Sequence, residues 1–174
     1  MESTLAILMR RKPLSETSLI VTWFTERTGK VKTVAKGARQ PRSPFAGRLD
    51  LFFESEIQYA KSNRSELHSL REVMTCSPHE SIRRNYYSTL LASYWIELID
   101  LVTEPEHPAP ELFHLLRRAF AYLEKSGADK RAMTHFESET ARYLGILEGP
   151  APVAIARVYH RLPQGRSELI RLLQ

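Results

Sequence analysis

The stretch that decides the fold is Leu19-Ile20-Val21-Thr22-Trp23-Phe24-Thr25-Glu26-Arg27-Thr28-Gly29-Lys30-Val31-Lys32-Thr33-Val34-Ala35-Lys36. The run 18–25 is rich in β-branched and aromatic residues, which strands favour. Glu26 to Gly29 is typical of a hairpin turn, because Gly29 can take a positive φ. Side chains alternate across a strand, so Val31, Thr33 and Ala35 share one face. The opposite face then carries Lys30, Lys32 and Lys36.

Outward from this hairpin, residues 4–75 have the pattern of a small β domain. Leu5, Ile7 and Met9 alternate with their neighbours, which predicts a first strand. Further strands are expected over 49–59 and 67–74. The segment 37–44 is too rich in Gly and Pro to continue a strand, so we expect a mobile basic loop there. Five short strands in about 75 residues favour a small barrel.

The pattern becomes helical at Ser77. Ser77-Pro78-His79-Glu80 has the spacing of a capping box, with proline at the first helical position. Apolar residues then recur at helical spacing over 91–102 and 112–123. Asp129 can cap a third helix whose apolar stripe holds Met133, Phe136, Tyr143 and Leu147. Two shorter helices are expected near 153–160 and 166–173. The sequence predicts an α+β protein with a barrel domain at 1–76 and a helical domain at 77–174.

Charge is distributed unevenly between these two domains. Residues 1–76 carry 13 basic and 8 acidic side chains, whereas residues 77–174 carry 12 of each. Between Glu26 and Asp50 there are seven basic residues and no acid. Such a field attracts polyanions, although it can also be a solvated surface that keeps a protein soluble. The candidate phosphate contacts are Arg10, Arg11, Lys12, Lys30, Lys32, Lys36, Arg39, Arg42 and Arg48.

Two aromatic residues near these cations are candidates for stacking on bases. Phe45 lies inside the basic loop and Trp23 lies in the expected strand 18–25. Stacking on an aromatic ring contributes about 1–3 kcal/mol per base and tolerates any sequence. The alternative is that both rings belong to the barrel core.

Enzymatic chemistry is poorly supported. The six histidines show no metal-ligand spacing, and the Gly-x-x-x-x-Gly-Lys-Ser/Thr phosphate loop is absent. The single cysteine, Cys76, excludes a disulfide framework and is expected to be a small buried filler. No apolar run is long enough for a membrane span, and the N-terminus is unlike a signal peptide. These features predict a non-enzymatic cytoplasmic protein with no cofactor, no metal and no membrane contact.

Several runs of residues resemble the bacterial RecO family of recombination mediators. They are Ser15 to Thr25, Gly29-Lys30-Val31, Val34-Ala35-Lys36-Gly37-Ala38-Arg39 and Ser43. In the helical half, Tyr94 to Leu98, Glu111-Leu112-Phe113, Phe136-Glu137 and Leu144-Gly145 are also similar. The resemblance extends over about residues 1–147. It implies an N-terminal OB-fold barrel followed by a helical domain.

The resemblance also implies a function. Members of the family bind single- and double-stranded DNA, anneal complementary strands and act with RecR to load RecA. They contact RecR through the OB domain, and the acidic tail of single-stranded DNA-binding protein docks on the helical domain. Lys36 and Arg39 match the family motif, and the implied location is the bacterial cytoplasm at the nucleoid.

This chain departs from the family pattern after Gly145. The four-cysteine zinc module of many relatives is absent, so no zinc is expected. Thr134-His135 stands where some members have an arginine pair, and Lys130, Arg131 and His135 are the candidates for receiving an acidic tail. Two other functions stay open: a protein-interaction adaptor that binds an acidic peptide, and an RNA-binding OB-fold protein.

Overall fold

A computed structural model describes residues 1–173 and divides the chain into two compact units. The barrel unit holds residues 1–79 together with 104–110, and the helical unit holds 80–103 and the residues from 111 onward. The chain therefore passes between the units three times. The sequence pattern predicts one junction at 76/77 and gives no indication that 104–110 returns to the barrel unit.

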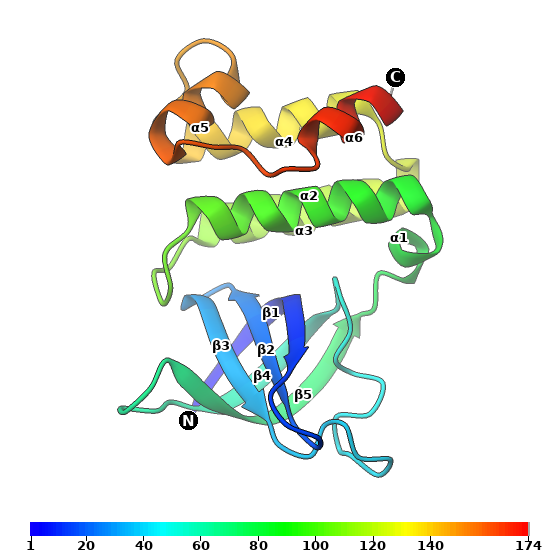
Figure 1. Cartoon of the computed structure of the whole chain (residues 1–174), viewed down its shortest axis with the longest axis vertical. Helices are drawn as coiled ribbons and strands as arrows, with labels where there is room; N and C mark the ends of the chain where they lie inside the picture. The colour runs from blue at the N-terminus through cyan, green and yellow to red at the C-terminus, as the bar shows by residue number, and fades with distance from the viewer. Residues whose placement is uncertain (174) are drawn as a thin grey trace. The chain divides into compact units, whose positions relative to one another are not determined.

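The barrel unit is built from five strands in a closed barrel (Figure 1). The strands are β1 (Glu2–Pro13), β2 (Leu19–Thr25), β3 (Gly29–Ala35), β4 (Glu54–Ala60) and β5 (Leu67–Ser77). They are paired in the order β1-β2-β3-β5-β4, and only the short β3–β5 pairing is parallel. The predicted fold, a five-stranded barrel followed by helices, is confirmed.

The interior of the barrel confirms the alternation predicted for β2 and β3. Val21, Trp23, Val31 and Ala35 all lie in one buried core cluster. The Trp23 indole Nε1 donates a hydrogen bond of 2.9 Å to the Thr33 hydroxyl, so the polar atoms of both buried side chains are paired. Both strands are thereby fixed with these side chains inward.

Strand β1 differs from the expected alternation. Ala6 and Leu8 enter the core cluster, and the pairing with β2 shifts register between Leu8 and Arg10. A β-bulge adds one residue to a strand and reverses the side-chain alternation beyond it. Arg10, which would follow Leu8 inward in a regular strand, is opposite Thr22 and exposed.

The segment between β3 and β4 is longer than predicted, because β4 begins at Glu54 and not at Leu49. Phe52 has φ 70°, a left-handed conformation that no regular strand accommodates. Phe45 and Leu49 from this segment join the barrel core. Of the apolar residues that suggested a longer strand, Leu49, Phe52 and Phe53 are buried by the loop, whereas Leu51 is exposed.

The junction after β5 is also corrected. Strand β5 continues to Ser77, and the short helix α1 (Glu80–Arg84) begins after His79, whose φ of 46° is left-handed. The predicted capping box therefore does not form, and the Ser77 hydroxyl lies 3.4 Å from the His79 Nδ1. Cys76 is exposed, so its prediction as a buried filler is wrong.

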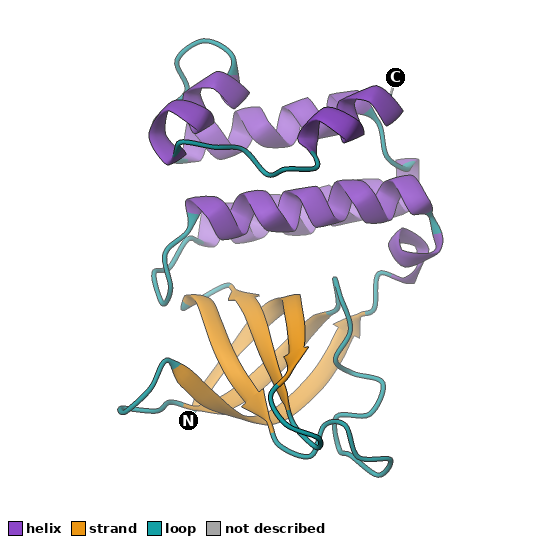
Figure 2. Ribbon diagram, viewed as in Figure 1, coloured by secondary structure: helices purple, strands orange, loops and turns teal. Residues whose placement is uncertain are grey.

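In the part of the chain that the structure describes, the helical unit contains α1 and five further helices (Figure 2). Asp129 caps the N-terminus of α4 by accepting from the Ala132 N–H at 2.7 Å, as predicted. Tyr143 and Leu147 are exposed, so the buried stripe of α4 ends at Ala141. The further helices are α2 (Tyr86–Val102), α3 (Pro110–Ser126), α4 (Lys130–Tyr143), α5 (Ala151–Tyr159) and α6 (Arg166–Leu172).

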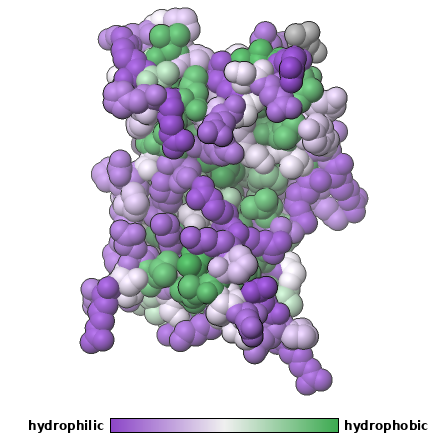
Figure 3. Space-filling view, viewed as in Figure 1, coloured by the Kyte–Doolittle hydropathy of each residue, from purple (hydrophilic) through white to green (hydrophobic). Residues whose placement is uncertain are grey.

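Hydrophilic side chains cover much of the visible face of the molecule, interrupted by hydrophobic patches (Figure 3). Within residues 1–173, the helices are too short or too polar to cross a membrane.

The loop 104–110 is held on the barrel unit by Glu106. Its backbone N–H donates to the Lys30 carbonyl at 2.8 Å, and its carboxylate lies 2.8 Å from both the His68 Nε2 and the Lys61 Nζ. The buried His68 ring accepts from the Ser62 N–H through Nδ1, which leaves Nε2 as the donor to Glu106. A Cβ on Gly29 would lie 2.0 Å from the His107 carbonyl oxygen, so only glycine permits this approach.

The C-terminal helix α6 is tied to α4 by a buried ion pair. The Arg166 guanidinium donates to both carboxylate oxygens of Glu137, at 2.6 and 3.0 Å, and Glu137 is fully buried. The Tyr94 hydroxyl donates to the same carboxylate at 2.5 Å. Burial raises the pKa of Tyr94, so this hydroxyl stays protonated and remains a donor.

We expect Arg166→Ala to lower the free energy of unfolding by about 3–5 kcal/mol, because it leaves the buried Glu137 carboxylate without its cation. Urea denaturation followed by circular dichroism measures the change. Arg171→Ala, an exposed arginine of the same helix, is the matched control. Adding Glu137→Gln to Arg166→Ala removes the unpaired charge and should restore part of the loss. Equal stability of Arg166→Ala and Arg171→Ala would contradict the role of the ion pair.

We expect Glu106→Ala to destabilise the protein by about 1–3 kcal/mol at neutral pH, because the buried His68 N–H loses its acceptor. Hydrogen bonding from Lys61 lowers the pKa of Glu106 below its ordinary value. The stabilisation is therefore complete at neutral pH and is lost as the pH falls through the acidic range.

Thermal unfolding at a series of pH values measures this dependence. Glu104→Ala, an exposed acid in the same loop, is the control. The prediction would be contradicted if the stability difference between wild type and Glu106→Ala became larger as the pH falls.

Candidate nucleic-acid interface

Cations from two strands meet on the outer face of β1, β2 and β3. Arg10 is opposite Thr22, and Thr22 is opposite Lys32, so these three residues form one row across the sheet. In the next row, Lys12 is opposite Ile20. Neighbouring strands lie about 4.8 Å apart, which places the Arg10 and Lys32 backbones roughly 10 Å from each other. This spacing allows side chains from both outer strands to contact one extended polyanion.

Two further lysines extend this outer face along β3. Lys30 precedes Lys32 by two residues and is half-buried, whereas Lys36 follows the strand and is exposed. The face is called the cationic face below, and it consists of Arg10, Lys12, Lys30, Lys32 and Lys36. Lys12, Lys32 and Lys36 are all exposed, and within residues 1–173 the structure gives none of their ammonium groups a hydrogen bond or ion pair.

Arg39 lies beside this face because the β1–β2 turn holds the loop that follows β3. The Ser15 hydroxyl accepts from the Thr17 and Ser18 N–H groups, which fixes the turn. The Arg39 N–H donates to the Thr17 carbonyl, and its guanidinium Nη1 donates to the Ser15 carbonyl at 2.6 Å. A guanidinium has five N–H donors, so others remain available to a phosphate.

Arg11 and Arg48 have different surroundings from the cationic face. Arg11 donates to the Leu49 carbonyl at 2.8 Å, and Arg48 donates to the Val73 carbonyl at 2.9 Å. Both guanidinium groups thus fasten the β3–β4 loop to the barrel. Arg42 is exposed in a turn of that loop. The nine candidate cations therefore do not form one continuous row.

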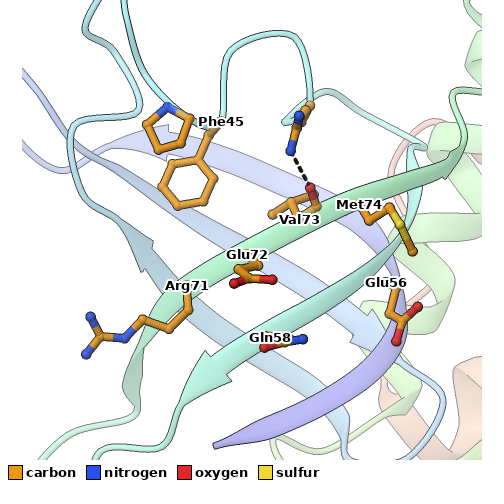
Figure 4. Close-up of a pocket in the computed structure, with 9 residues that line it drawn as sticks. Phe45, Glu56, Gln58, Arg71, Glu72, Val73 and Met74 are labelled. Carbon is orange, nitrogen blue, oxygen red and sulfur yellow. Dashed lines mark hydrogen bonds between the residues drawn. The ribbon is translucent and has the colours of Figure 1, made fainter.

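The two candidate stacking residues are buried in the barrel core. Trp23 has no exposed surface, and Phe45 is 6% exposed. Neither ring presents a face to solvent on which a base could stack, so this prediction is corrected. In Figure 4, Phe45 lies above β5, from which Arg71 and Glu72 project. The adjacent cavity of about 530 Å³ has walls of mixed charge, with Glu56 and Glu72 among them.

A second pocket lies between α3 and α4 in the helical unit. It has a volume of about 620 Å³ and joins an apolar surface to a cationic one. Of the three residues predicted to receive an acidic tail, Arg131 and His135 line it, whereas Lys130 does not. The α3–α4 pocket is lined by Leu115, Arg118, Ala119, Tyr122, Arg131, Ala132, His135 and Phe136.

Arg118 is a pocket residue that the sequence analysis did not select. The signal was present in the helical spacing, because Leu115, Arg118 and Tyr122 recur at intervals of three and four on α3. The sequence does not show that this face of α3 packs beside α4. Tyr122 also donates to the Asp129 carboxylate at 2.5 Å, which links the pocket to the cap of α4.

A barrel of this topology joined to a helical unit defines a two-domain protein of the OB-fold class. Residues 1–79 match the family model described as "Recombination protein O N terminal", and residues 83–147 match "Recombination protein O C terminal". The chain belongs to the RecO family.

Individual relatives support this assignment. The chain is 32% identical over 142 residues to the "DNA repair protein RecO" of Syntrophus aciditrophicus, covering 82% of this chain and 55% of that protein. The protein of the same name in Desulfatibacillum aliphaticivorans is 35% identical over 129 residues, which are 74% of this chain and 50% of that protein. An Exiguobacterium protein of the same name is 32% identical over 153 residues, which are 88% of this chain and 59% of that protein. The chain thus spans about half the length of these relatives.

Proposed function

We propose that this protein binds DNA in recombinational repair and that the cationic face is its main phosphate contact. The observation that carries the proposal is the convergence of four basic side chains from β1 and β3, with Lys36 directly after β3, on one face of the barrel. Membership of a family whose relatives are named DNA repair proteins supports the choice of DNA. Arg39 and Arg42 extend the contact into the loop after β3, while Arg11 and Arg48 keep that loop in place.

The same surface suits the annealing of complementary strands. Phosphates dominate the contacts of non-specific DNA-binding proteins, so a face of lysines and arginines binds any sequence. Neutralising the backbone charge of two strands lowers their mutual repulsion and allows the bases to pair. Assistance to RecA loading together with RecR is the wider role that we propose on the basis of the family.

We further propose that the α3–α4 pocket receives the acidic tail of single-stranded DNA-binding protein. The pocket favours a peptide that combines carboxylates with an apolar side chain. Arg118, Arg131 and His135 can bind the carboxylates, and Ala119 and the exposed Tyr122 ring lie beside them over the buried Leu115 and Phe136. The same pocket would serve an adaptor that binds only proteins, so DNA binding has to be tested separately.

We expect single-stranded DNA binding to weaken steeply with salt, with a log–log slope of about −3 to −4 if some 4–6 phosphates are neutralised. Lys32→Gln/Lys36→Gln should lower the affinity and reduce the steepness by about 1.4, because each lost phosphate contact removes about 0.7. Fluorescence anisotropy of a labelled oligonucleotide at several salt concentrations measures both quantities.

The control for this experiment is Arg161→Gln/Arg171→Gln, which removes two exposed cations of the helical unit and the same net charge. It should leave the slope unchanged. Equal losses in the two double variants would mean that net charge alone attracts DNA. An unchanged affinity for Lys32→Gln/Lys36→Gln would exclude the cationic face as the DNA contact.

We expect a nine-residue peptide of aspartates ending in phenylalanine to bind the helical unit of the full chain. Arg118→Glu/Arg131→Glu should weaken this binding by about tenfold or more, since hydrogen bonds to charged groups contribute about 1.5–3 kcal/mol each. Isothermal titration calorimetry measures the affinity, and Arg161→Glu/Arg171→Glu is the charge-matched control. Peptide binding without any oligonucleotide binding would favour the adaptor function.

A further inference from the structure

An exposed aromatic pair stands beside two arginines where α1 meets α2. Tyr86 is 64% exposed and Tyr87 is 46% exposed, and their rings lie 5.6 Å apart at an angle of 71°. Arg83 and Arg84 end α1 immediately before them and are exposed. These four residues are called the Tyr86–Tyr87 patch. They belong to the helical unit, and the cationic face belongs to the barrel unit.

Packing within the protein does not explain why both tyrosines are here. The first turns of α2 bury Ser88 and Leu91, while Tyr86 and Tyr87 point to solvent. Large side chains that leave aromatic surface in water, grouped at one place, mark a binding surface more often than chance exposure. Two adjacent rings at different angles offer stacking surfaces to two successive planar groups.

The charge around the rings identifies the class of ligand. No acidic residue lies in the first turn of α2. The nearest acid along the chain, Glu80, is 2.7 Å from the Arg84 guanidinium and is itself neutralised by that contact. Exposed ion pairs of this kind are weak, so a phosphate can replace the carboxylate as the partner of Arg84. In proteins that bind single-stranded nucleic acid, aromatic rings stack on the bases and neighbouring arginines contact the phosphates.

We propose that the Tyr86–Tyr87 patch is a second binding site for single-stranded nucleic acid, distinct from the cationic face. The tyrosine rings stack on unpaired bases, and Arg83 and Arg84 contact the adjacent phosphates. This inference rests on the proposed DNA-binding function and extends it. A protein with one site on each unit can bind one strand through its backbone and a second through its bases, which adds to the charge neutralisation proposed for the cationic face.

Photo-crosslinking of the unmodified full chain tests the site directly. On irradiation, an oligonucleotide that contains 5-iodouracil forms a covalent adduct with an aromatic side chain stacked on the halogenated base. Trypsin then releases the peptide 85–117, which mass spectrometry can sequence. We expect adducts on Tyr86 or Tyr87 in the unmodified protein. We expect the same adducts in the Lys32→Gln/Lys36→Gln variant, in which the cationic face is weakened.

Affinity measurements in that Lys32→Gln/Lys36→Gln background provide the second test. Tyr86→Ala/Tyr87→Ala should weaken the remaining oligonucleotide binding by about fivefold or more, the lower end of the effect of losing one stacked base. Tyr86→Phe/Tyr87→Phe keeps the rings and should bind like its parent. Tyr143→Ala is the matched control, because Tyr143 is 43% exposed and follows an arginine, Arg142, but has no aromatic neighbour in the chain.

The outcomes separate this inference from the proposed function. Adducts confined to the barrel unit, with no effect of the alanine variants, would overturn the second site and leave the cationic face intact. Adducts on Tyr86 or Tyr87 together with full binding by Lys32→Gln/Lys36→Gln would support the second site and reject the cationic face. The absence of any oligonucleotide binding would overturn both.

Discussion

The hydrogen bond between the Trp23 indole and the Thr33 hydroxyl, 2.9 Å long inside the barrel, fixes the faces of the central hairpin. A strand that slips by one residue exchanges its two faces, so the register of a sheet determines which side chains are exposed. With Trp23 and Thr33 inward, Thr22 and Lys32 have to point outward. A core contact that Lys32 does not make thus places Lys32 on the cationic face, and the bulge in β1 places Arg10 beside it.

The loop 104–110 illustrates what the sequence alone does not contain. Its residues lie between two helical patterns, and nothing local indicates that they belong to the barrel unit. Their placement depends on Glu106 reaching His68 and Lys61, which are about forty residues away along the chain. It depends equally on the missing side chain of Gly29. Sequence patterns report neighbours along the chain, whereas this contact exists only after the barrel has closed.

The sequence predicted those elements whose cause is local. The alternation of β3 and the cap at Asp129 depend on residues within one strand or one turn, and both are confirmed. The errors come from effects that a local pattern cannot show. The bulge after Leu8 turns Arg10 outward, and Phe45 is buried because the loop between β3 and β4 brings it into the barrel core. The sequence indicated Arg131 and His135 of the α3–α4 pocket but not Arg118, because Arg118 joins them only when the two helices pack together.

The distribution of arginine and lysine within the basic segment has a physical reason. Arg11, Arg39 and Arg48 each donate to a backbone carbonyl and hold the loop between β3 and β4 against the barrel. A guanidinium suits this role because its fork of donors can bind a carbonyl and still carry its charge at the surface. Lysine has a flexible stem and a compact charge, and Lys32 and Lys36 extend from the sheet into solvent. Within the basic segment, Arg39 and Arg48 therefore hold the loop, whereas Lys32 and Lys36 leave their charge at the surface, where the proposed function needs it, so the number of cations in a sequence overstates the number whose only surroundings are solvent.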